Sequence, residues 1–133
     1  MRRWVYLLCF GPDHELLTVR QEPGAEPALP RTRRRERETY VQAASRLMTA
    51  CTMRPGDAVA RIGSLPLWSP AGRCEIRVFT GHTRELFPVR AGGWEPWEDV
   101  LPRLAHPVSP ELALFAKGYV RGWIPDGWTT LDP

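Results

Sequence analysis

Residues 29–54, LPRTRRRERETYVQAASRLMTACTMR, constrain the fold of this chain more than any other stretch. The second half contains neither glycine nor proline and is rich in residues that favour helix, so it predicts one helix over residues 38–53. The helical period places four residues on one side, which we expect to face a core: Val41, Ala44, Met48 and Thr52. The first half is strongly cationic, with five arginines within residues 31–37. The chain therefore contains a helix that directly follows a cationic segment.

The order and spacing of residues in this stretch resemble the loop-helix motif of the Nudix hydrolase family. The matching residues are Leu29, Pro30, Glu38, Thr39, Ala43, Ala44, Arg46 and Met48. In the family, the glutamate and arginine at the positions of Glu38 and Arg46 brace the loop against the helix, so we expect these side chains to pair. The resemblance extends to the order of elements along the chain. It implies an α/β, Nudix-type fold, with a mixed β-sheet between helices in a single domain of residues 1–133.

The chain departs from the motif at two glycine positions and the final aliphatic position, where Thr32, Met53 and Arg54 stand, and at the positions that bind metal in the family. Leu47, Ala50 and Cys51 stand where the family has glutamates. Mg²⁺ is a hard cation that needs oxygen ligands, which leucine and alanine lack and for which a thiol is a poor substitute. The resemblance therefore implies a degenerate motif. We expect no metal site on this helix, no cofactor, and no ordinary Mg²⁺-dependent hydrolysis of diphosphates.

The composition limits the classes of partner and compartment. The chain has 133 residues with 14 prolines and 11 glycines, which is typical of one soluble domain with many turns. The net charge of +3 is modest and concentrated in residues 31–37, so we expect no interface with duplex nucleic acid. No apolar segment is long enough to span a membrane. Cys9, Cys51 and Cys74 form neither a metal-ligand pattern nor a disulfide framework, which indicates a cytoplasmic protein.

The rest of the chain predicts mainly strands and two further helices. The expected strands are residues 3–10, 15–20, 28–29, 58–68 and 74–82. Residues 93–101 resemble the family's late strand and short helix. A last helix is expected to have Ser109 as its cap and Pro110 at its first position. Its apolar side would consist of Leu112, Leu114, Phe115, Tyr119 and Val120.

The arginine run is the first candidate ligand site. Guanidinium groups, those of Arg31 and Arg33 among them, match the oxygens of phosphate and carboxylate groups. The alternative is a solvated run of charges without a ligand. Trp4, on the first expected strand, is a candidate for stacking on a flat ligand, with core packing as the alternative.

The altered helix positions are the second candidate site. Leu47, Ala50 and Cys51 are suited to a cavity for an apolar or aromatic molecule. The alternative is that they widen the core-facing side of the helix. A nucleophilic Cys51 would need a neighbouring base or a lowered pKa.

These observations favour a degenerate Nudix-fold protein that binds a small anionic or flat apolar ligand without metal-dependent hydrolysis. Whether it catalyses any reaction stays open, as does pairing into a homodimer. One alternative is an isomerase, lyase or cyclase that uses the altered cleft, and another is an atypical Nudix hydrolase. The remaining alternative is a protein-interaction or regulatory module that uses the arginine run together with Trp123 and Trp128.

Overall fold

A computed structural model describes residues 2–20, 22–51, 61–65, 74–86, 88–89, 91–103 and 110–121 of the chain. In these residues the strands are β1 (Arg2–Phe10), β2 (Glu15–Val19), β3 (Arg31–Arg33), β4 (Arg61–Leu65), β5 (Cys74–His82) and β6 (Gly92–Pro96). The helices are α1 (Tyr40–Ala50), α2 (Trp97–Arg103) and α3 (Pro110–Val120). None of the described helices is long and apolar enough to cross a membrane.

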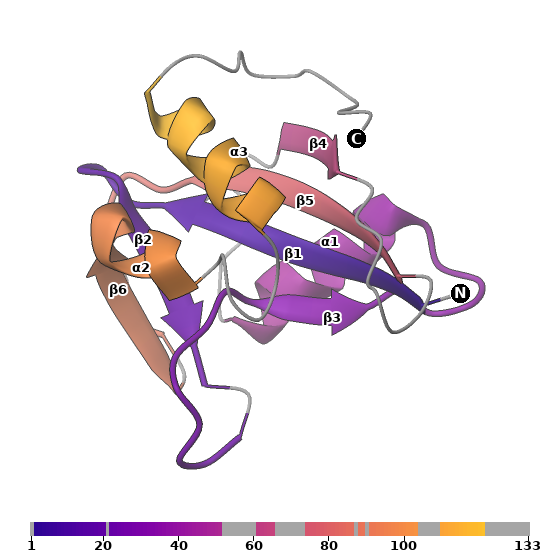
Figure 1. The fold of residues 1–133 in the computed structure, drawn as a ribbon. Coiled ribbons are helices and arrows are strands. Elements are labelled where there is room, and N and C mark those ends of the chain that lie inside the picture. The colour runs from indigo at the N-terminus through magenta and orange to yellow at the C-terminus, as the bar shows by residue number, and fades with distance from the viewer. Residues whose placement is uncertain are drawn as a thin grey trace.

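Strand β1 lies at the centre of a mixed sheet with the strand order β4-β5-β1-β2-β6 (Figure 1). It pairs in parallel with β5 from Arg2 opposite Cys74 to Phe10 opposite His82. Its other edge is shared, because the N-terminal half pairs antiparallel with β3 and the C-terminal end pairs with β2. The hairpin of β1 and β2 and the antiparallel pair of β4 and β5 confirm the expected strands. A turn between β4 and β5 is expected at residues 69–72, which lie outside the described residues.

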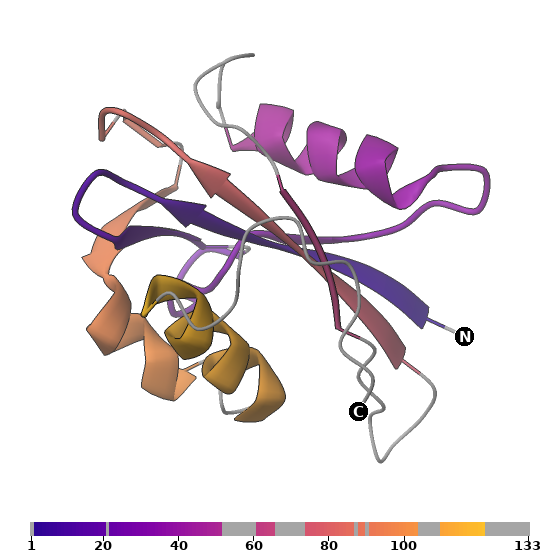
Figure 2. The ribbon, with the colours of Figure 1, turned by 90° about the horizontal axis from the view of Figure 1, so that it is seen from above.

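The alternation of side chains along β1 builds two cores, one on each face of the sheet. Tyr6, Leu8 and Phe10 face α2 and α3, where they pack with Val100 and Ala116. On the other face, β1 contributes Val5, Leu7 and Cys9 to a core completed by α1. Figure 2 shows α1 on one side of the sheet and the other two helices on the opposite side. The described part of the chain is therefore an α/β sandwich, as expected.

Helix α1 begins at Tyr40 because Thr39 caps it. The Thr39 hydroxyl accepts a hydrogen bond from the Gln42 N–H at 3.1 Å, and the Gln42 side chain accepts one from the Thr39 N–H at 2.8 Å. This reciprocal pair satisfies two N–H groups that a helix start leaves free. The helix thus begins two residues later than the sequence predicted. It is described as far as its C-cap Cys51, and Thr52 and Met53 lie outside the described residues.

The buried side of α1 differs from the predicted one. It consists of Ala43, Ala44, Leu47 and Cys51, each at most 5% exposed. Of the residues expected to face the core, Ala44 does so and Met48 is half-buried, but Val41 is 53% exposed. The core-facing side is therefore turned by roughly a quarter of a turn around the helix axis from the side expected. The pairing of Arg46 with the segment before the helix, described below, holds the helix in this orientation.

Replacing Val41 by lysine is expected to change the free energy of unfolding by less than about 1 kcal/mol, because the side chain is exposed and takes no part in the capping box, although a positive charge in the first turn of a helix is slightly unfavourable. Urea unfolding monitored by far-ultraviolet circular dichroism measures it. A loss above roughly 1.5 kcal/mol would place Val41 in the core and contradict the observed helix orientation.

Two further local predictions need correction. The strand expected at residues 28–29 is only a single bridge between Ala28 and Val19, and the strand β3 lies instead inside the arginine run. On α3, Leu114 is 68% exposed, whereas Ala113, Ala116, Tyr119 and Val120 pack against the core. The start of α3 at Pro110 agrees with the prediction. Its cap Ser109, the side chains of Leu112 and Phe115, and Trp123 and Trp128 lie outside the described residues.

Candidate functional site

A bidentate ion pair joins the segment before α1 to the helix itself. The Nε group of Arg46 donates a hydrogen bond to Oε2 of Glu38, and the Nη2 group donates one to Oε1, both at 2.9 Å. Nη2 also donates to the carbonyl oxygen of Arg33, and Nη1 donates to the Thr32 hydroxyl, both at 2.9 Å. One guanidinium thus ties strand β3, the following turn and α1 together.

The electrostatics of Glu38 reflect this arrangement. Hydrogen bonds from the Arg46 guanidinium and, secondarily, from the backbone N–H of Arg35 lower the pKa of Glu38 to about 2. The same contact raises the pKa of Arg46. Glu38 is therefore a carboxylate at any ordinary pH, with both of its oxygens occupied by donors of the chain itself.

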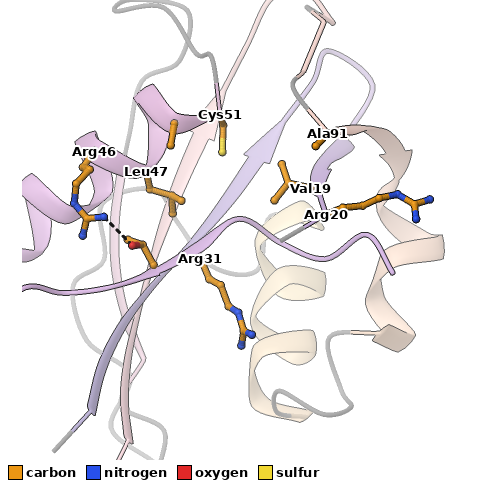
Figure 3. A pocket seen from close by; sticks show the side chains of 9 residues that line it. Val19, Arg20, Arg31, Arg46, Leu47, Cys51 and Ala91 are labelled. Carbon is orange, nitrogen blue, oxygen red and sulfur yellow. Dashed lines mark hydrogen bonds between the residues drawn. The ribbon is translucent and has the colours of Figure 1, made fainter. Parts of the chain in front are cut away.

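A pocket of about 330 Å³ opens beside the C-terminal half of α1. It is lined by Val19, Arg20, Arg31, Thr32, Arg46, Leu47, Ala50, Cys51 and Ala91. Figure 3 shows Leu47 and Cys51 on the α1 side and Val19 with Ala91 across from them. The lining combines apolar side chains with three arginines and contains no carboxylate. The pocket is thus suited to a ligand with an apolar part and a negative charge.

The two cysteines next to the pocket are not activated. Burial raises the pKa of the Cys51 thiol to about 11. Burial, and then the nearby Cys51, raise the pKa of Cys9 to about 12. A protonated thiol is a weak nucleophile and a weak metal ligand. The raised pKa of Cys51 therefore fits an apolar lining group better than a nucleophile.

The residues at this site do not fit a magnesium ion. Leu47 and Ala50 have no ligand atom, and the Cys51 thiol is held protonated. Across the described part of the chain, no three side chains of His, Cys, Asp or Glu lie close enough together to hold a metal ion. Mg²⁺ bound by protein uses carboxylate oxygens, which this face of α1 lacks.

The structure brings only some of the ligand-site residues proposed from the sequence together at the pocket. Arg31, Leu47, Ala50 and Cys51 all contribute to the pocket, but Trp4 and Arg33 do not line it. The Arg31 guanidinium lies 5.1 Å from the centre of the Trp4 ring and 3.4 Å from the Tyr6 hydroxyl. Figure 3 shows this side chain pointing away from Leu47 and Cys51.

The sequence did not identify Arg20, Val19 and Ala91 as pocket residues. They come together through the antiparallel pairing of β2 with β6, in which the Arg20 N–H donates to the Ala91 carbonyl at 2.7 Å. A side chain at Gly92 would clash with the Thr18 carbonyl, so this glycine permits the close approach of the two strands. The Gly92-Gly93 pair was the available signal.

Comparison with known proteins identifies the fold. No family model and no curated protein sequence matches the chain. Among solved structures, a C. elegans Ap4A hydrolase superposes with a TM-score of 0.69 at 12% identity, over 93% of this chain and 99% of that one. RenU, a Nudix hydrolase from M. smegmatis, gives a TM-score of 0.64 at 17% identity, over 99% and 89%. The chain has the Nudix fold.

The Nudix fold is also shared with the Nudix domain of Shewanella oneidensis NrtR, which was crystallised with ADP-ribose. That domain superposes with a TM-score of 0.58 at 15% identity, over 92% of this chain and 88% of the other. These matches confirm the expected fold, a mixed sheet between helices, along nearly the whole chain.

Proposed function

We propose that this chain is a Nudix-fold protein that binds a small anionic ligand with a flat or apolar body, without ordinary Mg²⁺-dependent diphosphate hydrolysis. The observation that carries the proposal is the lining of the pocket beside α1. Leu47, Ala50 and Cys51 give it an apolar wall, and arginines are its only charged residues. The ligand would be held where the family places a metal-bound diphosphate.

The arginines of the lining differ in how free they are to bind an anion. Arg46 uses Nε, Nη1 and Nη2 in its bonds to Glu38, Thr32 and Arg33, so it contributes mainly charge. Arg20 is exposed, and its Nη1 group donates a hydrogen bond to the Ala25 carbonyl at 2.9 Å. Since a guanidinium carries five N–H groups, Arg20 keeps donors for a phosphate or carboxylate. Figure 3 shows the Arg20 side chain extending away from Leu47 and Cys51, so in this proposal Arg20 would contact the anion at the outer rim of the pocket.

The apolar wall supports a flat or apolar ligand body. The volume of about 330 Å³ lies at the lower end of the range of roughly 300–1,000 Å³ for small-molecule sites. Nudix-fold neighbours act on Ap4A or were crystallised with ADP-ribose, and both molecules combine phosphates with flat bases. These two compounds are therefore the first probes to use.

Replacing Ala50 by glutamate is expected to weaken binding of ADP-ribose or Ap4A by at least about tenfold, because a carboxylate would face the phosphates in an otherwise cationic pocket. Ala50 is exposed, so the fold should tolerate the change. Ala50→Gln is the matched control, since it has the same size without the charge and should bind nearly as well as wild type. A thermal-shift titration measures all three proteins, because a ligand of the folded state raises Tm.

The outcomes separate the alternatives. Equal binding by the glutamate and glutamine variants would mean that the ligand is not in this pocket. Turnover of either probe that needs Mg²⁺ and stops with a chelator would establish an atypical Nudix hydrolase instead. Conversion of a probe without added metal would indicate an enzyme of another class.

A further inference from the structure

Two aromatic rings at the N-terminal end of β1 carry arginine side chains on their faces. The guanidinium carbons of Arg31 and Arg33 lie 5.1 and 6.0 Å from the centre of the Trp4 ring. Those of Arg34 and Arg77 lie 5.0 and 4.4 Å from the centre of the Tyr40 ring. Four arginines from β3, the following turn and β5 thus stack on two rings, in the range of cation–π attraction.

The two rings belong to opposite faces of the sheet, and the arginine run passes from one to the other. Trp4 packs against the core under α2 and α3, and Tyr40 packs against the core under α1. Between them, the Arg34 N–H donates to the Arg3 carbonyl at 2.8 Å and holds the run against β1. We call this surface the arginine edge. Its members are Arg2, Arg3, Trp4, Arg31, Arg33, Arg34, Arg35, Arg37, Tyr40 and Arg77.

The arginine edge concentrates the positive charge of the chain. The edge has eight arginines, and its segments contain three glutamates, Glu36, Glu38 and Glu75, which leaves a local excess of five positive charges, whereas the whole chain carries +3. Two of the three glutamates are already engaged: Glu38 by Arg46, and Glu75 by the Tyr40 hydroxyl at 2.8 Å and Arg77 at 3.3 Å. The edge therefore attracts anions, although the net charge of the chain is modest.

We propose that the arginine edge binds single-stranded nucleic acid. A surface that alternates guanidinium groups with aromatic rings meets both parts of such a strand, since arginine forks bind phosphates and bases stack on rings and guanidinium planes. Trp4 and Tyr40 are half-buried with arginines over their faces, so a base would stack on these ring–guanidinium layers rather than on a bare ring. Arg33, Arg35 and Arg37 are exposed. This surface adjoins the pocket proposed above and shares Arg31 with it, but its two rings and its other arginines do not line the pocket.

A single strand fits better than the two competing polyanions. In a duplex the bases are stacked on each other, so a duplex would use the arginines and leave the rings without a partner. An acidic peptide would likewise gain little from Trp4 and Tyr40. The contribution of the rings therefore distinguishes single-stranded nucleic acid from both.

The test uses fluorescence anisotropy with a labelled twelve-nucleotide RNA, the DNA of the same sequence, and the corresponding duplex. The double variant Arg35→Gln, Arg37→Gln should weaken binding of the single strands and reduce the salt slope by roughly 1.4, at about 0.7 per phosphate contact. The variants Trp4→Leu and Tyr40→Leu should each weaken binding by about tenfold. Thermal unfolding checks that each variant is folded at the temperature of the assay.

The matched control is the double variant Arg84→Gln, Arg121→Gln, which removes the same charge from exposed residues outside the arginine edge and should retain binding. Single-strand affinity that exceeds duplex affinity and depends on the rings supports the proposal, and tighter RNA binding would identify the 2′-hydroxyl as a contact. Equal loss in the control variant overturns it. Displacement of the strand by polyglutamate, with Trp4→Leu and Tyr40→Leu without effect, would instead assign the edge to an acidic protein.

Discussion

Replacing Leu47 by glutamate is expected to lower the free energy of unfolding by roughly 3 kcal/mol or more at pH 7. Leu47 is 5% exposed and packs in the core between α1 and the sheet, so the new carboxylate would be taken from water. Arg46, which precedes it in the chain, already uses its donors on Glu38, Thr32 and Arg33. The glutamate that the Nudix motif has at this position would therefore destabilise this chain. Urea unfolding of the two proteins measures the difference.

The pH dependence and a second variant test whether the stability loss arises from burial of the carboxylate. Burial raises the pKa of a carboxyl group, so the glutamate at position 47 would become neutral in the folded protein at a higher pH than in the unfolded chain. The stability deficit should therefore shrink as the pH falls from 7 to 5. Leu47→Met, which preserves volume and polarity, should cost less than about 1.5 kcal/mol. A glutamate variant as stable as wild type would show that this side of α1 is not a core surface.

Replacing Glu38 by glutamine is expected to lower Tm on the order of 5 °C at pH 7, because Arg46 loses its bidentate partner and β3 is held less firmly to α1. The pKa of Glu38 is about 2 in the folded protein against an ordinary value of 4.5, so its carboxylate contributes stability above pH 4.5. That contribution is lost as the pH falls through about 2. The difference in Tm between wild type and variant should thus be constant above pH 5 and shrink at lower pH.

Glu36→Gln provides the control for this experiment. Glu36 is an exposed glutamate two residues away in the same segment, and its removal changes the net charge equally. Its Tm should follow that of wild type across the pH range. If the two variants behave alike, the effect of position 38 reflects net charge, and the ion pair with Arg46 does not brace the segment.

Much of the fold was available from local patterns in the sequence. The sequence predicted the strands β1, β2, β4 and β5. For β1, the signal was its dense run of aliphatic and aromatic residues. The alternation of Ile76 and Val78 with Phe79 across the sheet follows directly from the period of a strand. The resemblance to the Nudix loop-helix predicted the pairing of Glu38 with Arg46, because the motif has a glutamate and an arginine at the same spacing of eight residues.

The rotation of α1 could not be predicted in the same way. Val41 and Leu47 are both apolar, and the helical period alone does not say which side meets the sheet. The bonds from Arg46 to Glu38, Thr32 and Arg33 fix the orientation, and they depend on where β3 pairs with β1. Tertiary contacts thus decide the orientation of α1, because its apolar residues are spread over more than one side of the helix.

The sequence by itself determined the order of the elements, the pairing of Glu38 with Arg46, and the absence of carboxylates at positions 47, 50 and 51. Only the tertiary structure decided that Trp4 and Leu47 lie on opposite faces of the sheet, and that Arg20 and Ala91 line the pocket. The physical reason is the range of the interactions. Helix and strand periods act within a few residues, whereas the pairing of β2 with β6 joins segments far apart in the chain, and that pairing creates the pocket.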